Sequence, residues 1–273
     1  MSDERTIEQR PEGWDASAEH YDEVASQISN EIAPLLCDLA GVREGLRVLD
    51  VGAGPGTVAL VAAERGANVT AVDFSPGMIA RLHRNAEERG VEVDAEVMDG
   101  QALTFDDDTF DAAVSSFAVI FFPRREDGFS EMNRVVKNSG TVAVSVWSTP
   151  DRMDFFQVIA EGVQRALPDL PSRPPPDWLA IASPDGLRKA MLDAGAAEVE
   201  VHTENITWEI PSGAWLRERF REMSPAARGL LDGLPPEDQE RVLDSIQEVL
   251  EDRFGTGPVT LENEAHIGVA TPG

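Results

Sequence analysis

The chain has 273 residues, and its 50 acidic side chains against 23 basic ones leave a formal net charge of −27. A field of that sign repels nucleic acid and anionic membrane surfaces, which excludes nucleic-acid binding from the expected functions. No apolar run approaches the roughly 18 residues that span a bilayer, and the charged N-terminus lacks a secretory apolar segment. We therefore expect a cytoplasmic protein without membrane insertion, long enough for one large α/β core.

The scarcity of lysine and the single cysteine lead to two further expectations, one about salt and one about disulfides. Only Lys137 and Lys189 are lysines. We hypothesise adaptation to high salt, where a dense acidic surface stays hydrated; the alternative is an acidic protein from an arginine-rich genome. The single cysteine, Cys37, excludes an intramolecular disulfide or a cysteine-based metal cluster, and it is expected to pack as a small apolar residue.

The first half of the chain alternates between apolar strand-like runs and helical periodicity. Apolar residues at helical spacing over 15–40 predict two cap helices. The alternation that follows indicates a mostly parallel sheet with right-handed crossovers. Ser75 and Pro76 form a plausible start for one of its helices. The predicted strands are 46–51, 68–73, 91–98, 110–115 and 140–147, and the predicted helices are 57–65, 76–89 and 124–137.

The second half begins with a proline-rich segment. Five prolines between Leu167 and Pro176 predict an extended loop, because proline interrupts helices. A helix is expected over 184–194, and long strands over 197–210 and 257–270. The segment between these strands is amphipathic and helical over 212–254.

The most informative segment is the glycine turn that follows the first apolar run. Gly52, Gly54 and Gly56 stand at alternate positions before a predicted helix, which places backbone N–H groups beside a ligand. A dinucleotide fingerprint would need its third glycine at Thr57, and a phosphate-binding P-loop would need a Lys-Ser or Lys-Thr pair, which is absent. Asp50, two residues before the first glycine, favours a ligand with an ammonium or sulfonium group.

Acidic residues also follow the next two strands. Asp73 ends the second strand, where a carboxylate can accept hydrogen bonds from both ribose hydroxyls. Asp99, Gly100 and Gln101 follow the third strand and form a loop able to meet an adenine edge. No basic residue stands at these strand ends, so a nucleoside with a zwitterionic amino-acid tail suits them better than a phosphate-bearing cofactor.

Four motifs together indicate a family. The sequences VLDVGAGPG, VDFSPGMI, DGQAL and FDAAVSSFAVIFF resemble the class I S-adenosylmethionine-dependent methyltransferases, and most closely the UbiE-like (type 11 methyltransferase) group. The segment from Met132 to Val142 resembles that family's turn into the fifth strand, with Asn138-Ser139 where Pro-Gly is usual. The resemblance implies an α/β, Rossmann-like, doubly wound sheet of seven mostly parallel strands with one antiparallel strand. Helices would cover both faces, and a helical cap would lie at the N-terminus.

The resemblance also implies a domain organisation and a set of cofactor-binding residues. We expect one methyltransferase domain over 1–273, with cap helices in 1–40, a cofactor-binding core in 41–150, and a C-terminal half, 151–273, whose insertion 212–254 covers the substrate. The cofactor is expected to be S-adenosyl-L-methionine, its methionine end seated by Asp50 and the glycines. Asp73 would hold the ribose, and Asp99 with Gln101 the adenine. The full predicted set is Asp50, Gly52, Ala53, Gly54, Gly56, Asp73, Phe74, Asp99, Gly100, Gln101 and Ser115, with Ser116 as the alternative to Ser115.

Catalytic residues are less clearly indicated. Phe121 and Phe122 stand where many relatives carry a histidine, so a catalytic histidine is not expected there. His20 is a candidate general base, although a lone histidine is more often structural. Tyr21, with Trp14, is a candidate lid residue over the cofactor. No histidine–carboxylate spacing suggests a metal site.

These observations predict methyl transfer to an oxygen, nitrogen or activated carbon atom of a small metabolite. A quinone-like acceptor is implied by the family resemblance alone. Two alternatives stay open. One is a non-catalytic S-adenosylmethionine-binding or scaffold protein; the other is an NAD-dependent oxidoreductase, disfavoured by the glycine spacing and by the lack of a Tyr-Lys or histidine constellation.

Overall fold

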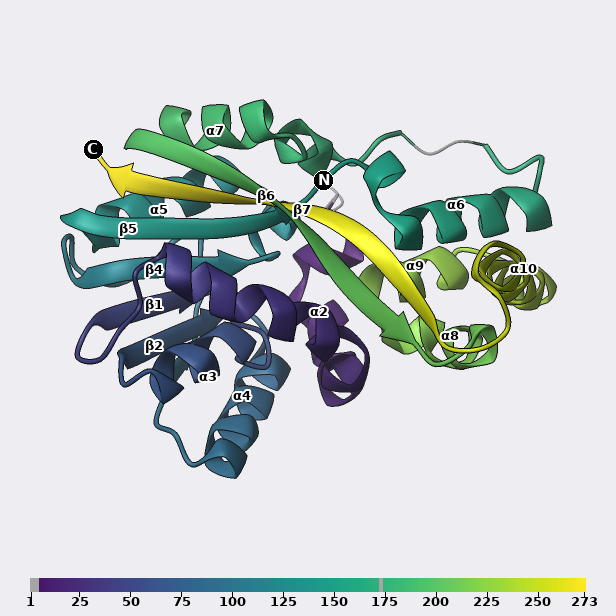
Figure 1. Cartoon of the computed structure of the whole chain (residues 1–273), viewed down its shortest axis with the longest axis horizontal. Helices are drawn as coiled ribbons and strands as arrows, with labels where there is room; N and C mark the ends of the chain where they lie inside the picture. The colour runs from purple at the N-terminus through teal and green to yellow at the C-terminus, as the bar shows by residue number, and fades with distance from the viewer. Residues whose placement is uncertain (1–4, 172–173) are drawn as a thin grey trace.

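The protein, represented by a computed structural model, is described over residues 5–171 and 174–273, with the side chains of 20 and 22–27 left out. Seven strands form one sheet in the order β3-β2-β1-β4-β5-β7-β6 (Figure 1). The first five pair in parallel, and β7 runs antiparallel to both of its neighbours. The predicted seven-stranded sheet with one antiparallel strand is confirmed. The strands are β1 (Arg47–Val51), β2 (Asn68–Asp73), β3 (Asp94–Val97), β4 (Phe110–Ser116), β5 (Val136–Trp147), β6 (Ala196–Ile210) and β7 (Val259–Pro272).

Helices cover both faces of the sheet, because alternate residues of the central strands are apolar on both sides. Val48 of β1 packs in the cluster formed with α2 and α3, whereas its neighbour Leu49 packs in the cluster formed with α5 and α7. The helices are α1 (Pro11–Asp15), α2 (Ala18–Leu39), α3 (Thr57–Glu64), α4 (Pro76–Arg89), α5 (Arg125–Val135), α6 (Asp154–Ala166), α7 (Pro184–Asp193), α8 (Gly213–Arg219), α9 (Pro225–Asp232) and α10 (Pro236–Phe254).

The N-terminal segment differs from the prediction of two helices within 15–40. A short α1 is followed by one long helix, α2, in which Pro34 causes no break. The break lies instead at residues 16–17. Its position follows from Asp15, whose Oδ1 accepts hydrogen bonds from Ser75 Oγ at 2.6 Å and from the Gly77 N–H at 2.8 Å. These bonds dock the end of α1 onto the start of α4, and the chain must turn there to begin α2.

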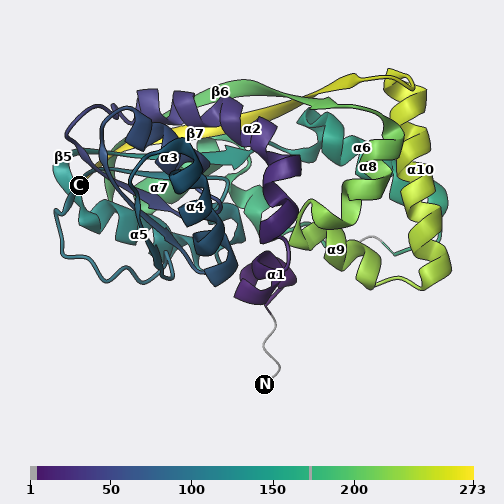
Figure 2. The same cartoon turned by 90° about the horizontal axis from the view of Figure 1, so that it is seen from below.

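A second, helical part lies beyond the edge of the sheet (Figures 1 and 2). Strands β6 and β7 pair over their full lengths, but β5 pairs with β7 only from Val142 to Trp147, so the far end of the β6–β7 hairpin projects past the sheet. Helices α6, α8, α9 and α10 pack around that projecting end in a third apolar cluster, which contains Trp208, Phe220 and Leu261. Helix α6 has no counterpart among the predicted elements.

Five short 3₁₀ segments lie in the described part of the chain: η1 (Ile7–Gln9), η2 (Val119–Phe121), η3 (Pro150–Arg152), η4 (Asp177–Ile181) and η5 (Phe220–Glu222). All of them except η3 carry residues of the cavities described below. In the described part of the chain, no helix is long and apolar enough to cross a membrane.

Candidate functional site

A cavity of about 120 Å³ lies at the carboxyl ends of β1, β2, β3 and β4. The order of the strands reverses between β1 and β4, and open α/β sheets bind ligands at such a point. The N-terminal segment closes the cavity from the other side. The wall consists of Arg5, Gln9, Trp14, Tyr21, Ser29, Gly52, Gly54, Asp73, Phe74, Met78, Met98, Asp99, Gly100, Gln101, Ser116, Phe117, Ala118, Phe121, Phe122 and Pro123.

The glycine turn brings main-chain atoms to this wall. Gly52, Gly54 and Gly56 have φ angles of +69°, +55° and +94°, which favour glycine. A Cβ on Gly52 would lie 2.3 Å from the Ala118 Cβ, so close packing also requires glycine there. A Cβ on Gly54 would meet nothing within 4 Å, because Gly54 faces the cavity. Gly56 lies outside the wall and begins α3.

Asp73 joins this turn to the end of β2. Its Oδ2 accepts a hydrogen bond from the Gly54 N–H at 2.9 Å, and its Oδ1 accepts one from the Ser75 N–H at 2.9 Å. Burial raises the pKa of Asp73 to about 6, against the lowering effect of these two hydrogen bonds. Each carboxylate oxygen keeps a second lone pair, so Asp73 can accept further hydrogen bonds from hydroxyl groups in the cavity.

Asp50 lies behind the turn rather than in the wall of the cavity. It is 1% exposed, and its Oδ2 accepts a hydrogen bond from the Ala59 N–H of α3 at 3.0 Å. Its Oδ1 has no partner in the described part of the chain. Burial raises the pKa of Asp50 to about 7. Because Asp50 does not line the cavity, the structure does not place its carboxyl group against a ligand there, and its observed contact is with the first turn of α3. Ala53, like Asp50, does not line the cavity.

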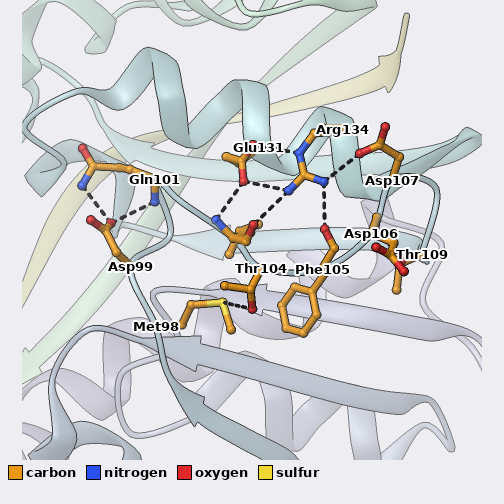
Figure 3. Close-up of polar contacts among 11 residues, drawn as sticks. Met98, Asp99, Gln101, Thr104, Phe105, Asp106, Asp107, Thr109, Glu131 and Arg134 are labelled. Atoms are coloured by element: carbon orange, nitrogen blue, oxygen red, sulfur yellow. Dashed lines mark hydrogen bonds and ion pairs between the residues drawn. The ribbon is translucent and has the colours of Figure 1, made fainter.

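The loop after β3 is held by its own side chains. Asp99 Oδ1 accepts hydrogen bonds from the backbone N–H and the Nε2 of Gln101, both at 2.9 Å (Figure 3). Gln101 Oε1 accepts a further hydrogen bond from the Arg124 N–H at 2.8 Å. Gly100 packs closely, since a Cβ there would lie 2.6 Å from Val51 Cγ1 and 2.8 Å from Phe122 Cζ. The loop therefore presents a fixed set of polar atoms to the cavity.

Arg134 of α5 fixes the continuation of this loop. Its guanidinium donates to the carbonyl oxygens of Leu103 at 3.0 Å and Phe105 at 2.8 Å, and to Asp107 Oδ1 at 2.7 Å (Figure 3). It also forms two bonds of 2.8 Å with the carboxylate of Glu131, which in turn accepts from the Leu103 N–H. These contacts lower the pKa of Glu131, chiefly through its hydrogen bond with Arg134. One arginine thus ties residues 103–107 to α5.

At the end of β4 the structure places Ser116, and not Ser115, in the wall. The Ser115 hydroxyl is fully buried and donates to the Val51 carbonyl at 2.7 Å, inside the sheet. Side chains alternate between the faces of a strand, so only one of two consecutive serines can face the cavity. The structure therefore places Ser116, the alternative considered in the sequence analysis, at the cavity, and Ser115 behind it.

Of the two candidate catalytic residues, His20 and Tyr21, the structure describes the side chain of Tyr21 alone. The side chain of His20 lies outside the described residues. Tyr21 lines the cavity and meets Trp14 edge to face, with ring centroids 5.7 Å apart. Trp14 Nε1 donates to the Glu8 carbonyl at 2.8 Å, and its ring contacts Phe121 edge to face at 5.1 Å. Two rings of the N-terminal segment, Trp14 and Tyr21, thus pack with Phe121 of η2 at the wall of the cavity.

A second cavity of about 430 Å³ adjoins the first and shares Gln9, Trp14, Tyr21, Ser29, Phe117 and Phe121 with it. Among the side chains that the structure describes, no lysine, arginine or histidine lines this cavity. Its remaining wall comes mainly from the helical part, β5, the β6–β7 hairpin and η4, with further residues from the N-terminal segment, α2 and η2. These residues are Thr6, Glu8, Ile28, Ile120, Trp147, Met153, Phe155, Phe156, Ile159, Pro176, Asp177, Trp178, Trp208, Phe220, Met223, Ser224, Ala226, Ala227, Leu230 and Asn263.

Two wall residues had no signal in the sequence. Arg5 is the one cationic side chain described in the wall of the first cavity, and it precedes every motif of the chain. Phe117 lines both cavities with φ at +54°, an uncommon conformation for an aromatic residue, and its ring stacks on Trp147 at 3.9 Å. Only the fold brings Arg5 to this wall and gives Phe117 its left-handed backbone.

Comparison with known proteins agrees with this geometry. A family model described as a methyltransferase domain matches residues 48–140, the segment that holds the glycine turn and the first five strands up to the start of β5. An uncharacterised protein of Mycobacterium tuberculosis is 32% identical over 159 residues, covering 58% of this chain and 57% of that protein. The chain thus spans little more than half the length of this relative.

Another relative is a demethylmenaquinone methyltransferase of Renibacterium salmoninarum, 33% identical over 179 residues, which cover 62% of this chain and 73% of that enzyme. Among solved structures, the YcgJ protein of Bacillus subtilis superposes with a TM-score of 0.58 at 20% identity, covering 89% of this chain and 99% of that one. This likeness concerns the fold. The 33% identical methyltransferase relative and the matching family model show that the chain belongs to the class I S-adenosylmethionine-dependent methyltransferases of the UbiE-like type.

Proposed function

We propose that this chain transfers the methyl group of S-adenosylmethionine to an oxygen, nitrogen or activated carbon atom of a small, uncharged molecule. The observation that carries the proposal is the shared wall of the two cavities. One cavity is lined by the strand-end residues of the family motifs, and the other, larger one is lined mainly by apolar side chains. Two ligands held in them would meet at Phe117, Phe121 and Tyr21.

The residues of the first cavity suit the cofactor in three places. Asp73 has lone pairs available for two ribose hydroxyls, and the fixed loop at Asp99 and Gln101 would face the adenine. Gly54 and Gly52 allow the methionine moiety to approach the main chain. Arg5 would complement the carboxylate of that moiety.

When bound, S-adenosylmethionine supplies a sulfonium methyl that is already a strong electrophile. The chain's own contribution is to orient and enclose the reacting groups, which can lower a barrier by about 7–11 kcal/mol. The aromatic lid formed by Trp14, Tyr21 and Phe121 would exclude water from the junction. Tyr21 lines both cavities at that junction, and its phenol oxygen would accept a hydrogen bond from the O–H or N–H group of the acceptor and so orient it.

The first test is calorimetric titration with S-adenosylhomocysteine, with NAD as a parallel ligand. We expect the nucleoside to bind and NAD not to bind. The second test is formation of S-adenosylhomocysteine from S-adenosylmethionine with a panel of neutral aromatic alcohols, amines and carbonyl compounds. Binding of the nucleoside without turnover on any of them would favour a non-catalytic binding protein, and binding of NAD would remove the proposal.

A further inference from the structure

Among the described residues that line the second cavity, Asn263 of β7 is the one buried amide side chain. It is 1% exposed and lies among apolar residues, opposite Ile206 in the hairpin and bridged to Met153. Its Oδ1 accepts a hydrogen bond from the Phe155 N–H at 3.3 Å. Its Nδ2 has no partner in the described part of the chain.

The orientation of this amide is set by its surroundings. The Phe155 N–H needs an acceptor, so the oxygen of Asn263 must face it and the NH₂ group must face elsewhere. A buried donor without a partner costs roughly 1–3 kcal/mol. The other polar side chains of this cavity, Thr6, Glu8, Gln9, Tyr21, Ser29, Asp177 and Ser224, are all more exposed than Asn263. An uncompensated donor in the apolar part of a cavity points to a ligand that supplies the acceptor.

We propose that Asn263 Nδ2 donates a hydrogen bond to an oxygen atom of the methyl acceptor and thereby determines its specificity. The proposal rests on the proposed function, because it places the acceptor in the second cavity. The acceptor is a neutral, planar, mostly apolar molecule that carries a hydroxyl or carbonyl oxygen at the end bound by Asn263.

Charge and shape of the wall support this choice of ligand. No cationic side chain described in the wall would pair with an anionic acceptor, and Glu8 and Asp177 would repel one. An ammonium group carries no lone pair, so a cationic acceptor bound through its charged end would leave the NH₂ group of Asn263 without an acceptor. The stacked rings of Phe117 and Trp147 offer a flat surface at the junction with the first cavity, and Trp178, Phe155 and Trp208 supply further aromatic walls.

A site built around a hydrogen bond rejects analogues that lack the bonded group, because its own polar atom is then left unpaired. A hydrogen bond from Asn263 therefore predicts selectivity between ligands with and without the oxygen, which packing alone does not predict. Removing the donor should lower the affinity for ligands that carry the oxygen and leave the affinity for ligands without it unchanged.

The experiment uses the full chain saturated with S-adenosylhomocysteine and two probes, 2-naphthol and naphthalene, titrated by calorimetry. Asn263→Leu removes the donor at similar volume. Asn205→Leu is the matched control, since Asn205 lies on β6 of the same hairpin but is exposed. We expect Asn263→Leu to lower the affinity for 2-naphthol about tenfold and not to lower the affinity for naphthalene. The affinity for S-adenosylhomocysteine should be unchanged.

Three outcomes would overturn the role of Asn263: an unchanged affinity for 2-naphthol in the variant, an equal loss for both probes, or preferential binding of 2-naphthylmethylammonium by the wild-type protein. If Asn263→Leu does not fold, Asn263→Ala tests the same selective loss without adding volume. Failure of S-adenosylhomocysteine to bind the wild-type chain would instead remove the proposed function, so the two failures are separable.

Discussion

The backbone N–H of Gly54 donates a 2.9 Å hydrogen bond to Asp73 Oδ2, and this bond connects the turn after β1 to the end of β2. The two parallel strands are paired neighbours, so their carboxyl ends meet at the same edge of the sheet. Asp73 thus has a structural role, holding the turn, beside its proposed role as acceptor for the ribose.

Replacing Asp73 by alanine should reduce the affinity for S-adenosylhomocysteine by about 100-fold, because the ribose loses its acceptor and the Gly54 N–H loses its partner. Calorimetric titration measures the loss. Asp73→Asn is the graded control: it keeps one acceptor oxygen and should retain part of the affinity. Equal affinities of wild type and Asp73→Ala would show that the nucleoside binds elsewhere.

The ligand-free protein should lose stability as the pH rises from about 4 to about 7. Burial raises the pKa of Asp50 to about 7 and that of Asp73 to about 6, both above the value of about 3.9 in an unfolded chain. Over this range the unfolded state releases protons that the folded state retains, so unfolding becomes more favourable, and the effect levels off above about pH 7.

Urea denaturation of wild type and Asp50→Asn at about pH 5 and about pH 8 checks this dependence. The variant lacks one of the two raised carboxyl groups, so its free energy of unfolding should fall less between the two pH values. Asp185→Asn is the control, since the Asp185 side chain is 98% exposed, and it should behave as wild type. The same fall in all three proteins would assign the effect to other groups.

Replacing Arg134 by methionine should destabilise the protein by about 2 kcal/mol, since the variant loses the bonds to Leu103, Phe105 and Asp107. It should also weaken S-adenosylhomocysteine binding, because the loop 99–107 is then held at one end only. Arg188→Met is the matched control: among the described residues, Arg188 pairs only with the exposed Asp185, and its loss should cost less than about 0.5 kcal/mol. Denaturation and titration of the two variants side by side distinguish these results.

The high negative charge predicts that the melting temperature depends on the salt concentration. With a net charge of −27, repulsion within the folded chain should be relieved by screening, so the melting temperature should rise between about 0.1 M and about 2 M KCl. A melting temperature that is flat or falling would contradict adaptation to high salt. Sucrose at matched osmolality is the control, and an equal rise in sucrose would point to solvent exclusion rather than to charge.

Much of the core could be predicted because local signals and packing agree there. The bounds of β2 and α4 match the prediction, since the apolar run of β2 is buried and Ser75 caps α4 by accepting from the Met78 N–H at 3.1 Å. The strand-end residues Asp73, Asp99 and Gln101 were predictable for the same reason: parallel strands bring their carboxyl ends to one edge.

The rest depends on contacts between distant segments. The break before α2 is set by Asp15 bonding to Ser75, 60 residues away, which no local pattern of 15–40 reveals. The exposure of Ser116 instead of Ser115 depends on which face of β4 meets the cavity. Asn263 acquires its surroundings only when β7 pairs with β6 and α6 packs beside them.

The β6–β7 hairpin has one more consequence, for how such a protein can change over evolutionary time. The chain leaves β6 at Ile210 and re-enters β7 at Val259, and these two residues are paired neighbours. The helices α8, α9 and α10 therefore begin and end at adjacent points, as an insertion into a two-stranded ribbon (Figure 1). Such a segment can be exchanged for another of different length and shape without moving the strands that carry the glycine turn. New acceptors could be recruited by this exchange while the cofactor half of the molecule stays as it is.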